Sequence, residues 1–142
     1  MVTIVVIAHA PLASALVAAA KHVYSRDPCA ASRQLVGMDV APDALFEATV
    51  TEAKEFVRKV DQGEGVLVLT DVQGATPGNV AARLVEPGRV AAIAGVNMPM
   101  LLRSLCYGGA ATLDTLVAKA KAGGEQGVQQ LGTEPSARVK SG

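Results

Sequence analysis

The sequence is poor in the residue types that mark disulfide-rich, nucleic-acid-binding or disordered proteins. Its 142 residues include two cysteines, no tryptophan, two tyrosines and two phenylalanines, and 13 basic residues balance 13 acidic ones. This balance does not favour a polyanionic partner such as DNA, and the aromatic side chains are too few to stack on bases. Half of the residues are hydrophobic, which excludes disorder of the chain as a whole. We therefore expect one folded domain of ordinary size and no nucleic-acid partner.

The two cysteines, Cys29 and Cys106, do not form a Cys-x-x-Cys pair and are too few for a disulfide framework. We expect both to be reduced and buried, because cysteine outside a disulfide behaves as a small hydrophobic residue. Reduced thiols in turn favour a cytoplasmic location.

The first 20 residues contain no charged side chain and resemble a signal peptide only superficially. No Lys or Arg precedes the apolar stretch, and His9 and Pro11 interrupt it. Its first half is β-branched and its second half is rich in Ala and Leu, which predicts a strand followed by a helix. Because no other stretch is long and apolar enough, we expect no membrane insertion.

Strand-like and helix-like segments alternate along the chain, which is typical of an α/β fold. Strands are predicted at Val2–Ala8, Arg33–Val40, Gly65–Thr70 and Arg89–Gly95. Helices are predicted from Pro11 to Tyr24 and over Ala44–Val60, Thr76–Val85, Met100–Tyr107 and Leu113–Ala122. The repetition predicts a doubly wound, mainly four-stranded parallel sheet with helices on both faces. The second strand is the most polar and is expected near an edge.

The end of the chain is less regular. Gly127–Leu131 is a candidate for a short last strand, and Thr133–Gly142 reads as a polar tail. We therefore divide the chain into a domain at residues 1–132 and a tail at residues 133–142.

Polar residues stand where three of the predicted strands end. In an open parallel sheet this is the edge at which ligands bind. The residues are His9, Asp71 and Asn97. Neither a Walker phosphate loop nor a Gly-x-Gly-x-x-Gly motif is present, so a nucleotide-binding fingerprint is absent. Asn97 fits a turn residue that bonds to the loop backbone as well as it fits a residue that supports a site.

His9 and Asp71 each have an ordinary structural explanation. A lone histidine at a strand end can be packed and bonded to a carbonyl, and a lone aspartate before a glycine-containing loop can cap that loop. Together, His9 and Asp71 predict a nucleophilic histidine, because a carboxylate at one ring nitrogen selects the tautomer and leaves the other nitrogen as a nucleophile. The carboxylate also stabilises the positive charge that grows on the ring during attack.

The segment after Asp71 predicts an anion site. Gly74 and Ala75 lead into a helix start, with Thr76 as the expected N-cap and Pro77 in the first helical position. Backbone N–H groups and the helix dipole favour an anion there. A nucleophilic imidazole, an orienting carboxylate and this cradle together indicate a phosphoryl acceptor. A serine hydrolase is less natural because no serine lies in a strand-to-helix elbow, and no ligand cluster indicates a metal or other cofactor.

The segments IVVIAHA, LVLTDVQGATPGNVAARL and AGVNMPMLL resemble the mannose-family enzyme IIA domain of the bacterial phosphoenolpyruvate-dependent sugar phosphotransferase system, and the resemblance runs from about Val2 to Leu131. It implies that His9 is phosphorylated on Nε2 by the carrier protein HPr, that Asp71 holds Nδ1 and that Thr76 supplies a hydroxyl. It also implies transfer to a IIB-type acceptor, and a homodimer with an exchanged antiparallel strand at Gly127–Leu131.

The sequence departs from the family in the residues around the site. Ala10 and Pro11 follow the histidine where the family often has Gly or Ser, Gln73 replaces a common aromatic residue, and Ala75 replaces a frequent Gly. We expect these changes to leave the chemistry intact and to alter which partner docks.

Three other functions stay open from the sequence. The chain resembles the phosphotransfer subunit of phosphoenolpyruvate-dependent dihydroxyacetone kinase in the same residues. A non-catalytic regulatory module, whose phosphorylation state is read by a partner, is also compatible with them. A receiver-like domain phosphorylated on Asp71 is disfavoured, because the acidic pair that binds Mg²⁺ in such sites is missing after the first strand.

Overall fold

The computed structural model describes residues 1–27, 34–107 and 111–132. Its strands are β1 (Thr3–His9), β2 (Leu35–Val40), β3 (Val66–Thr70) and β4 (Val90–Ala94). Its helices are α1 (Leu12–Val23), α3 (Phe46–Val60), α4 (Thr76–Leu84), α5 (Met98–Tyr107) and α6 (Leu113–Gln126). The observed elements follow the predicted ones closely, and the main extension is α6, which continues past Ala122.

The sheet has four parallel strands in the order β2-β1-β3-β4. This confirms the predicted doubly wound sheet and the edge position of β2. The chain moves outward from β1 to β2 and, on the other side, outward from β3 to β4. The direction of winding therefore reverses between β1 and β3, and a sheet of this kind has its binding crevice beyond the carboxyl ends of those two strands.

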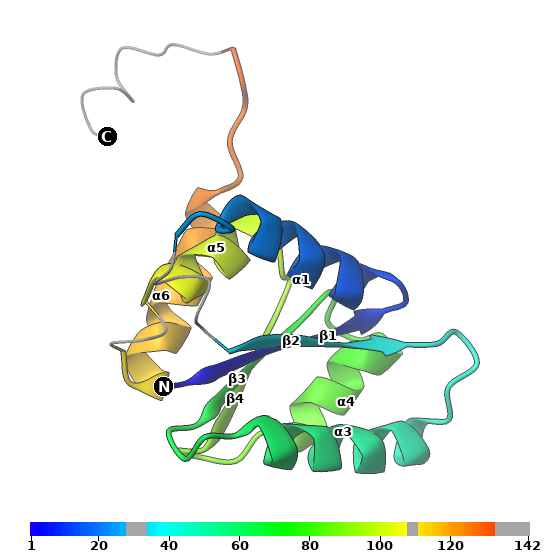
Figure 1. Ribbon diagram of the computed structural model, residues 1–142. Coiled ribbons are helices and arrows are strands. Elements are labelled where there is room, and N and C mark those ends of the chain that lie inside the picture. The colour runs from blue at the N-terminus through cyan, green and yellow to red at the C-terminus, as the bar shows by residue number, and fades with distance from the viewer. Residues whose placement is uncertain (28–33, 108–110, 133–142) are drawn as a thin grey trace.

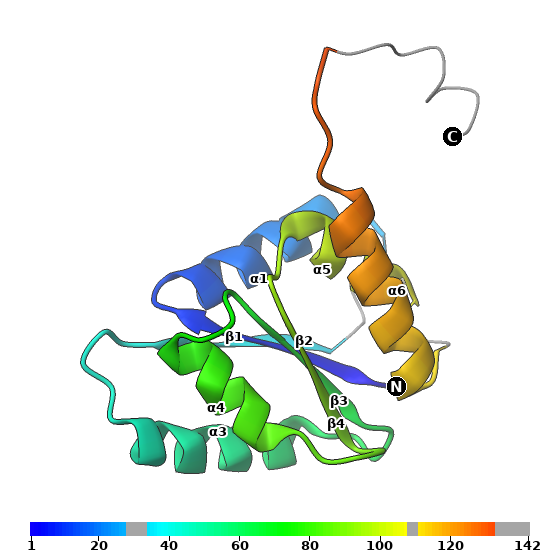
Figure 2. The same ribbon diagram turned by 180° about the vertical axis from the view of Figure 1, so that it is seen from behind.

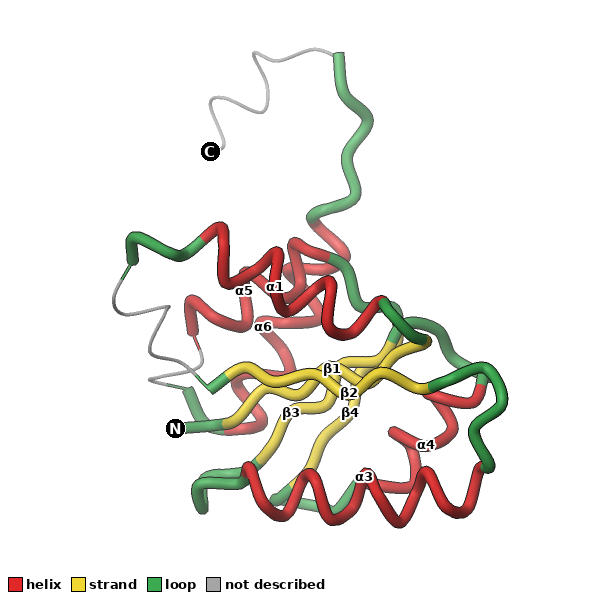
Figure 3. Tube along the Cα trace, turned by 45° about the vertical axis from the view of Figure 1, so that its right-hand side comes forward, coloured by secondary structure: helices red, strands yellow, loops and turns green. Residues whose placement is uncertain are grey.

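Helices cover both faces of the sheet. Helices α1, α5 and α6 lie on one side and α3 and α4 on the other (Figure 1), and the view from behind shows the same division (Figure 2). Along β1, Ile4 and Val6 join the core under the first group, whereas Val5 and Ile7 join the core under the second. Both faces are thus dry, which explains why the apolar run of β1 does not alternate with polar residues. The tube view shows the sheet as the layer between the two groups (Figure 3).

The predicted strand at Gly127–Leu131 does not join the sheet of this chain. Gly127 caps α6, and the segment that follows leaves the domain (Figure 1). Val128 and Leu131 are 77% and 89% exposed, so neither packs on the described part of its own chain. Exchange of this segment with a second copy stays a prediction, and the predicted tail at 133–142 lies outside the described residues.

The expected burial of Cys106 is wrong. The residue is exposed at the end of α5, and its Sγ lies 3.0 Å from the hydroxyl oxygen of Tyr24. The buried face of α5 comprises Met100, Leu101, Ser104 and Leu105, and the next residue already falls on the outer side of the helix. The contact with Cys106, together with burial and the charges of Cys106 and Asp27, raises the pKa of Tyr24 to about 12. Cys29 and Arg33, for which burial and a strand were expected, lie outside the described residues.

Candidate functional site

His9 and Asp71 meet at the carboxyl edge of the sheet. The parallel register pairs Ile7 with Thr70, so the residues that follow on β1 and β3 emerge side by side. The ring Nδ1 of His9 lies 2.6 Å from Oδ2 of Asp71. The backbone N–H of His9 donates to the same oxygen at 3.1 Å. One carboxylate oxygen therefore holds both the ring and the main chain of His9.

The Asp71 carboxylate is held in its ionised form. Its other oxygen, Oδ1, accepts a hydrogen bond from the Val72 amide at 3.0 Å. Burial raises the pKa of Asp71, but hydrogen bonds from the His9 ring and from the backbone amides of His9 and Val72 outweigh burial, so the pKa lies below its ordinary value of 3.8. At neutral pH the carboxylate is therefore charged and can only accept hydrogen bonds.

The carboxylate determines the tautomer of His9. Since Asp71 only accepts, the neutral imidazole carries its proton on Nδ1, and Nε2 keeps its lone pair. The side chain of His9 is 48% exposed, whereas that of Asp71 is 12% exposed. The largely buried acid thus orients a ring that is half-exposed and whose other nitrogen is not held by Asp71, which is the arrangement of an activated nucleophile.

The backbone around Asp71 is anchored from the neighbouring strand. Just beyond β4, the amide of Gly95 donates to the carbonyl of Asp71 at 3.1 Å. The amide of Val96 donates to the carbonyl of Thr70 at 2.9 Å. The carboxylate therefore projects from a main chain that is hydrogen-bonded on the β4 side as well as paired with β1.

The N-cap of α4 differs from the prediction. Thr76 was expected to cap the helix, but the first intrahelical bond runs from the Asn79 amide to the carbonyl of Ala75 at 2.9 Å, which makes Ala75 the N-cap. Thr76 is the first helical residue, and no side chain caps the helix. The hydroxyl of Thr76 is therefore not used as a cap, and the first-turn amides of α4 have no partner within the helix.

Two glycines shape the loop between Asp71 and α4. Gly74 has a positive φ of 91°, which side-chain-bearing residues rarely adopt. A Cβ on Gly78 would lie 2.4 Å from the carbonyl oxygen of Val72, so the first turn of α4 packs directly against the loop backbone. Sequence analysis missed Gly78. Its signal was a glycine just after Pro77, where a better helix former would otherwise be favoured.

A second helix N-terminus at this edge already holds a carboxylate. Asp39, near the end of β2, accepts hydrogen bonds from the Ser14 amide at 3.1 Å and from the Ser14 hydroxyl at 2.6 Å. These bonds neutralise the first turn of α1, which begins just after His9. Neither α1 nor α4 is capped by the side chain of its own N-cap residue, but the first turn of α1 receives the Asp39 carboxylate from β2. Sequence analysis missed this pair, whose only signal was an acidic residue near the end of a strand.

The side chain of Asn97 is engaged within the fold. Its Oδ1 accepts a hydrogen bond from the Met100 amide at 2.9 Å, and its Nδ2 donates to the carbonyl of Gly124 at 3.1 Å. Asn97 thus caps the start of α5 and ties it to α6. These are the bonds of the turn residue that the sequence left open, and support of the site by Asn97 stays a prediction.

Metal-binding and membrane-spanning features are not found in the part of the chain that the structure describes. These residues contain no group of three or more His, Cys, Asp or Glu side chains that could hold a metal ion. Across the same ranges, every helix is too short or too polar to cross a lipid bilayer.

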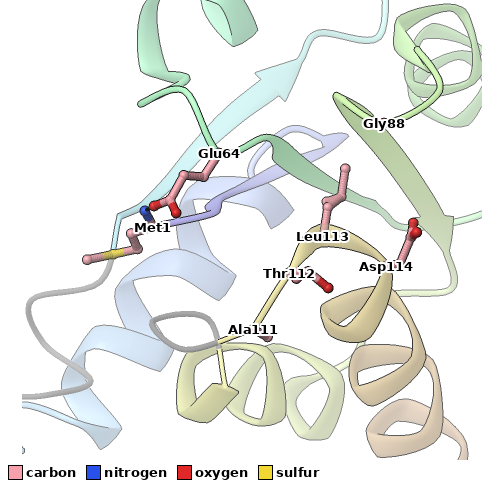
Figure 4. A pocket seen from close by; sticks show the side chains of 7 residues that line it. All are labelled: Met1, Glu64, Gly88, Ala111, Thr112, Leu113 and Asp114. Atoms are coloured by element: carbon pink, nitrogen blue, oxygen red, sulfur yellow. Dashed lines mark ion pairs between the residues drawn. The ribbon is translucent and has the colours of Figure 1, made fainter.

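A cavity of about 460 Å³ lies at the opposite ends of the strands from His9. Its lining includes Glu64 and Gly88, which precede β3 and β4, and the start of α6. The amino group of Met1 forms an ion pair with Glu64 beside it (Figure 4). This cavity is separate from the site at His9 and Asp71.

Comparison with known proteins finds one family. A family model described as the "PTS system fructose IIA component", EIIA-man, matches residues 3–121. The mannose-specific EIIAB component of the phosphotransferase system (PTS) in Escherichia coli K12 is 35% identical over 100 residues, which are 69% of this chain and 31% of that protein. The match therefore spans less than half of that relative's length.

Solved structures share the fold at lower sequence identity. The phosphotransferase system component EIIA from Streptococcus agalactiae has a TM-score of 0.80 at 20% identity and covers 94% of this chain and 100% of its own. The mannose/sorbose-specific IIA subunit from Enterococcus faecalis has a TM-score of 0.75 at 20% identity, over 94% of this chain and 96% of its own. These likenesses show the shared α/β fold.

Proposed function

Because this chain belongs to the EIIA-man family of the sugar phosphotransferase system, we propose that it carries a phosphoryl group on His9, received from phosphorylated HPr and passed to a IIB-type protein. The observation that carries the proposal is the 2.6 Å contact between His9 Nδ1 and Asp71 Oδ2 at the carboxyl edge of the sheet. In the neutral ring this contact leaves the lone pair on Nε2, and the side chain of His9 is 48% exposed, so the ring can meet a phosphoryl donor.

The transfer is a displacement at phosphorus. The lone pair on Nε2 of His9 attacks the phosphorus atom, and the N–P bond of the donor phosphohistidine breaks with its electron pair returning to the donor ring. The proton on Nδ1 of His9 stays in place, so His9 loses no proton during the attack. The ring becomes positively charged, and the Asp71 carboxylate stabilises that charge. Attack on the phosphorylated His9 by an acceptor nitrogen repeats the same step.

The loop after Asp71 is proposed to hold the phosphoryl oxygens. In phosphoryl transfer, positioning and charge stabilisation supply most of the catalysis. The backbone amides of Gly74, Ala75 and Thr76 and the hydroxyl of Thr76 lie at the uncapped N-terminus of α4. The positive end of that helix favours an anion. The carboxylate of Asp39 at the start of α1 disfavours the alternative position, because like charges repel.

The proposal includes an assembly and a location. We assign residues 1–132 to the phosphotransfer domain and residues 133–142 to a tail. A homodimer would form by exchange of the segment at Gly127–Leu131 as an antiparallel strand, which would cover the exposed side chains of Val128 and Leu131. A cytoplasmic location follows from the proposed donor, phosphorylated HPr.

A reconstituted phosphorylation assay tests the proposal. The protein is incubated with phosphoenolpyruvate, enzyme I and HPr, and intact mass is expected to show one acid-labile phosphoryl group. His9→Ala should remain unlabelled, whereas His22→Ala, at an exposed position near the end of α1, should be labelled like the wild type. Persistence of the label in His9→Ala would refute the assignment.

Incubation of the phosphorylated protein with candidate acceptors shows which of them takes the phosphoryl group. Transfer of the label to a IIB protein supports the sugar-transport role, and transfer to dihydroxyacetone kinase supports the alternative pathway. Retention of the label, combined with phosphorylation-dependent binding to another protein, supports a regulatory module.

A further inference from the structure

We propose that a groove between α3 and α4 binds a small organic anion of the phosphomonoester class. The groove has a volume of about 620 Å³ and is formed by the carboxyl-terminal halves of the two helices and the turn before β4. Both helices run back from the carboxyl edge of the sheet, so the groove lies at the opposite edge from His9 and Asp71. The proposal therefore does not depend on phosphoryl transfer.

Cationic side chains dominate the lining of the groove. Its cations are Lys54, Arg58, Arg83 and Arg89, and its acids are Asp61 and Glu86. Lys54 and Arg58 lie four residues apart on α3 and so share one face of the helix. Neither makes a hydrogen bond or an ion pair with any residue in the described ranges. The groove thus carries net positive charge and two cations that are available to a ligand.

One acid of the groove is already committed. The side chain of Asp61 is only 8% exposed, and its Oδ2 accepts a hydrogen bond from Nη2 of Arg89 at 2.7 Å. Its Oδ1 accepts from the Gly63 amide at 2.8 Å. Asp61 thereby fixes the guanidinium of Arg89 at the edge of the groove. A guanidinium has five N–H donors in a planar fork, so Arg89 can also bind a phosphate.

The fourth cation, Arg83, is paired outside the groove. Its guanidinium lies 5.6 Å from the centre of the Phe46 ring and forms an ion pair with Glu47 at 3.2 Å. Phe46 and Glu47 begin α3 and do not line the groove, so the guanidinium of Arg83 is engaged there, and the cations left for a ligand are Lys54, Arg58 and Arg89.

The floor of the groove is apolar. Val57, Leu84 and Val90 are 6%, 5% and 5% exposed, and Val85 is 48% exposed at the rim. A bare inorganic ion would gain nothing from this surface, whereas a ligand with a carbon skeleton would bury apolar area there. The volume also falls in the range of about 300–1,000 Å³ that is typical of small-molecule sites. The ligand class that fits is an organic phosphate of sugar-phosphate size.

The helix dipole explains part of the positive charge at the end of α3. Cations in the last turn of a helix interact favourably with its dipole, which accounts for Arg58. The dipole does not account for Lys54, which precedes the last turn, or for Arg89, which lies on a different segment. Their convergence on one groove is what favours a ligand.

Titration with glucose 6-phosphate, followed by ¹H–¹⁵N NMR, tests the proposal. We expect saturable shifts of amides in residues 54–61 and 83–90 and none with glucose. Inorganic phosphate should bind more weakly because it lacks the carbon skeleton. The double variant Lys54→Gln with Arg58→Gln should weaken binding by about tenfold, as expected for the loss of charge-assisted hydrogen bonds. Lys121→Gln, an exposed cation on α6, should bind like the wild type.

Three results would overturn the proposal. They are the absence of shifts in these residues, shifts confined to the loop at 71–76 and His9, and equal affinity of the double variant and the wild type. Since none of them affects labelling of His9, failure here is distinguishable from failure of the phosphotransfer proposal.

Discussion

Oδ2 of Asp71 contacts His9 twice, since the ring Nδ1 lies at 2.6 Å and the backbone amide at 3.1 Å from the same oxygen. The tautomer of the imidazole therefore depends on the same oxygen that adds a hydrogen bond to the main chain of His9, which is also paired with β2. A variant at Asp71 changes both, and the predictions below separate chemical from structural effects by pairing rate measurements with measurements of folding.

Asp71→Asn should slow phosphorylation of His9 by roughly 10²–10⁴-fold. The amide carries no negative charge to stabilise the imidazolium, and its NH₂ group favours the tautomer with the wrong nitrogen protonated. Single-turnover transfer from phosphorylated HPr measures the rate, and circular dichroism checks the fold. Asp43→Asn, an exposed change before α3, should react at the wild-type rate. Equal rates for both variants would contradict the role given to Asp71.

Titration of Asp71 by ¹³C NMR should give a pKa below 3.8, because hydrogen bonds from His9 and Val72 outweigh the effect of burial. His9→Ala removes the ring hydrogen bond and should raise that pKa. An unchanged pKa in His9→Ala would show that the ring does not stabilise the carboxylate.

The lowered pKa of Asp71 also predicts how the stability of the fold changes as the pH falls. The pKa of Asp71 is lower in the folded than in the unfolded chain, so the ionised carboxylate stabilises the fold above the unfolded value. That contribution disappears as the pH falls below 3.8 through the folded value. Urea unfolding at several pH values should therefore show a weaker loss of stability on acidification in Asp71→Asn than in the wild type.

Gly78→Ala should lower the free energy of unfolding by about 1–3 kcal/mol, because the new Cβ would lie 2.4 Å from the Val72 carbonyl oxygen and the backbone must move. Since that loop carries the proposed phosphoryl-binding amides, transfer to His9 should slow as well. Urea denaturation measures stability. Asn79→Ala, the next residue of α4, adds no Cβ and should change stability by no more than about 0.5 kcal/mol. A wild-type stability for Gly78→Ala would mean that the loop can relax freely.

Asp39→Ala should destabilise the protein by about 1 kcal/mol, the usual effect of removing a carboxylate from a helix N-terminus. The change removes both hydrogen bonds to Ser14 at the start of α1. Asp39→Asn keeps an oxygen acceptor and should lose less. If both variants unfold at the wild-type urea concentration, the contact does not stabilise α1.

The proposed strand exchange predicts a dimer in solution. Light scattering should give the mass of two chains for the wild type and of one chain for the double variant Val128→Asp with Leu131→Asp, because aspartate is disfavoured in strands and apolar interfaces. Val23→Asp, an exposed apolar position on α1, serves as the control and should remain dimeric. A monomeric wild type would end the exchange proposal.

The sheet and its pair of polar residues could be predicted from the sequence because the signals are local. An uninterrupted apolar run ending in His9 and another ending just before Asp71 indicate buried parallel strands, and parallel strands bring their carboxyl ends to one edge. The order of the strands then decides whether the two residues touch, and the register of Ile7 with Thr70 shows that they do.

Three features of the structure could not be predicted from the sequence, each for its own physical reason. The Ser14–Asp39 bonds join residues of two elements whose separation only the folded chain determines. Whether Cys106 lies inside or outside α5 depends on a rotation of about 100° per residue about the helix axis, which composition does not reveal. The N-cap of α4 moved by one residue from Thr76 to Ala75 because sequence patterns place helix ends only to within a residue or two.

The burial of β1 has a consequence for how partner proteins meet the site. The residues from Thr3 to Ala8 are fully enclosed, and the exposed histidine is the very next one along the same strand. Segments packed on both sides open only in rare, near-global fluctuations. The backbone position of His9 is therefore fixed when the protein folds. When a partner protein binds, only the partner's side chains must become ordered before the reaction can proceed.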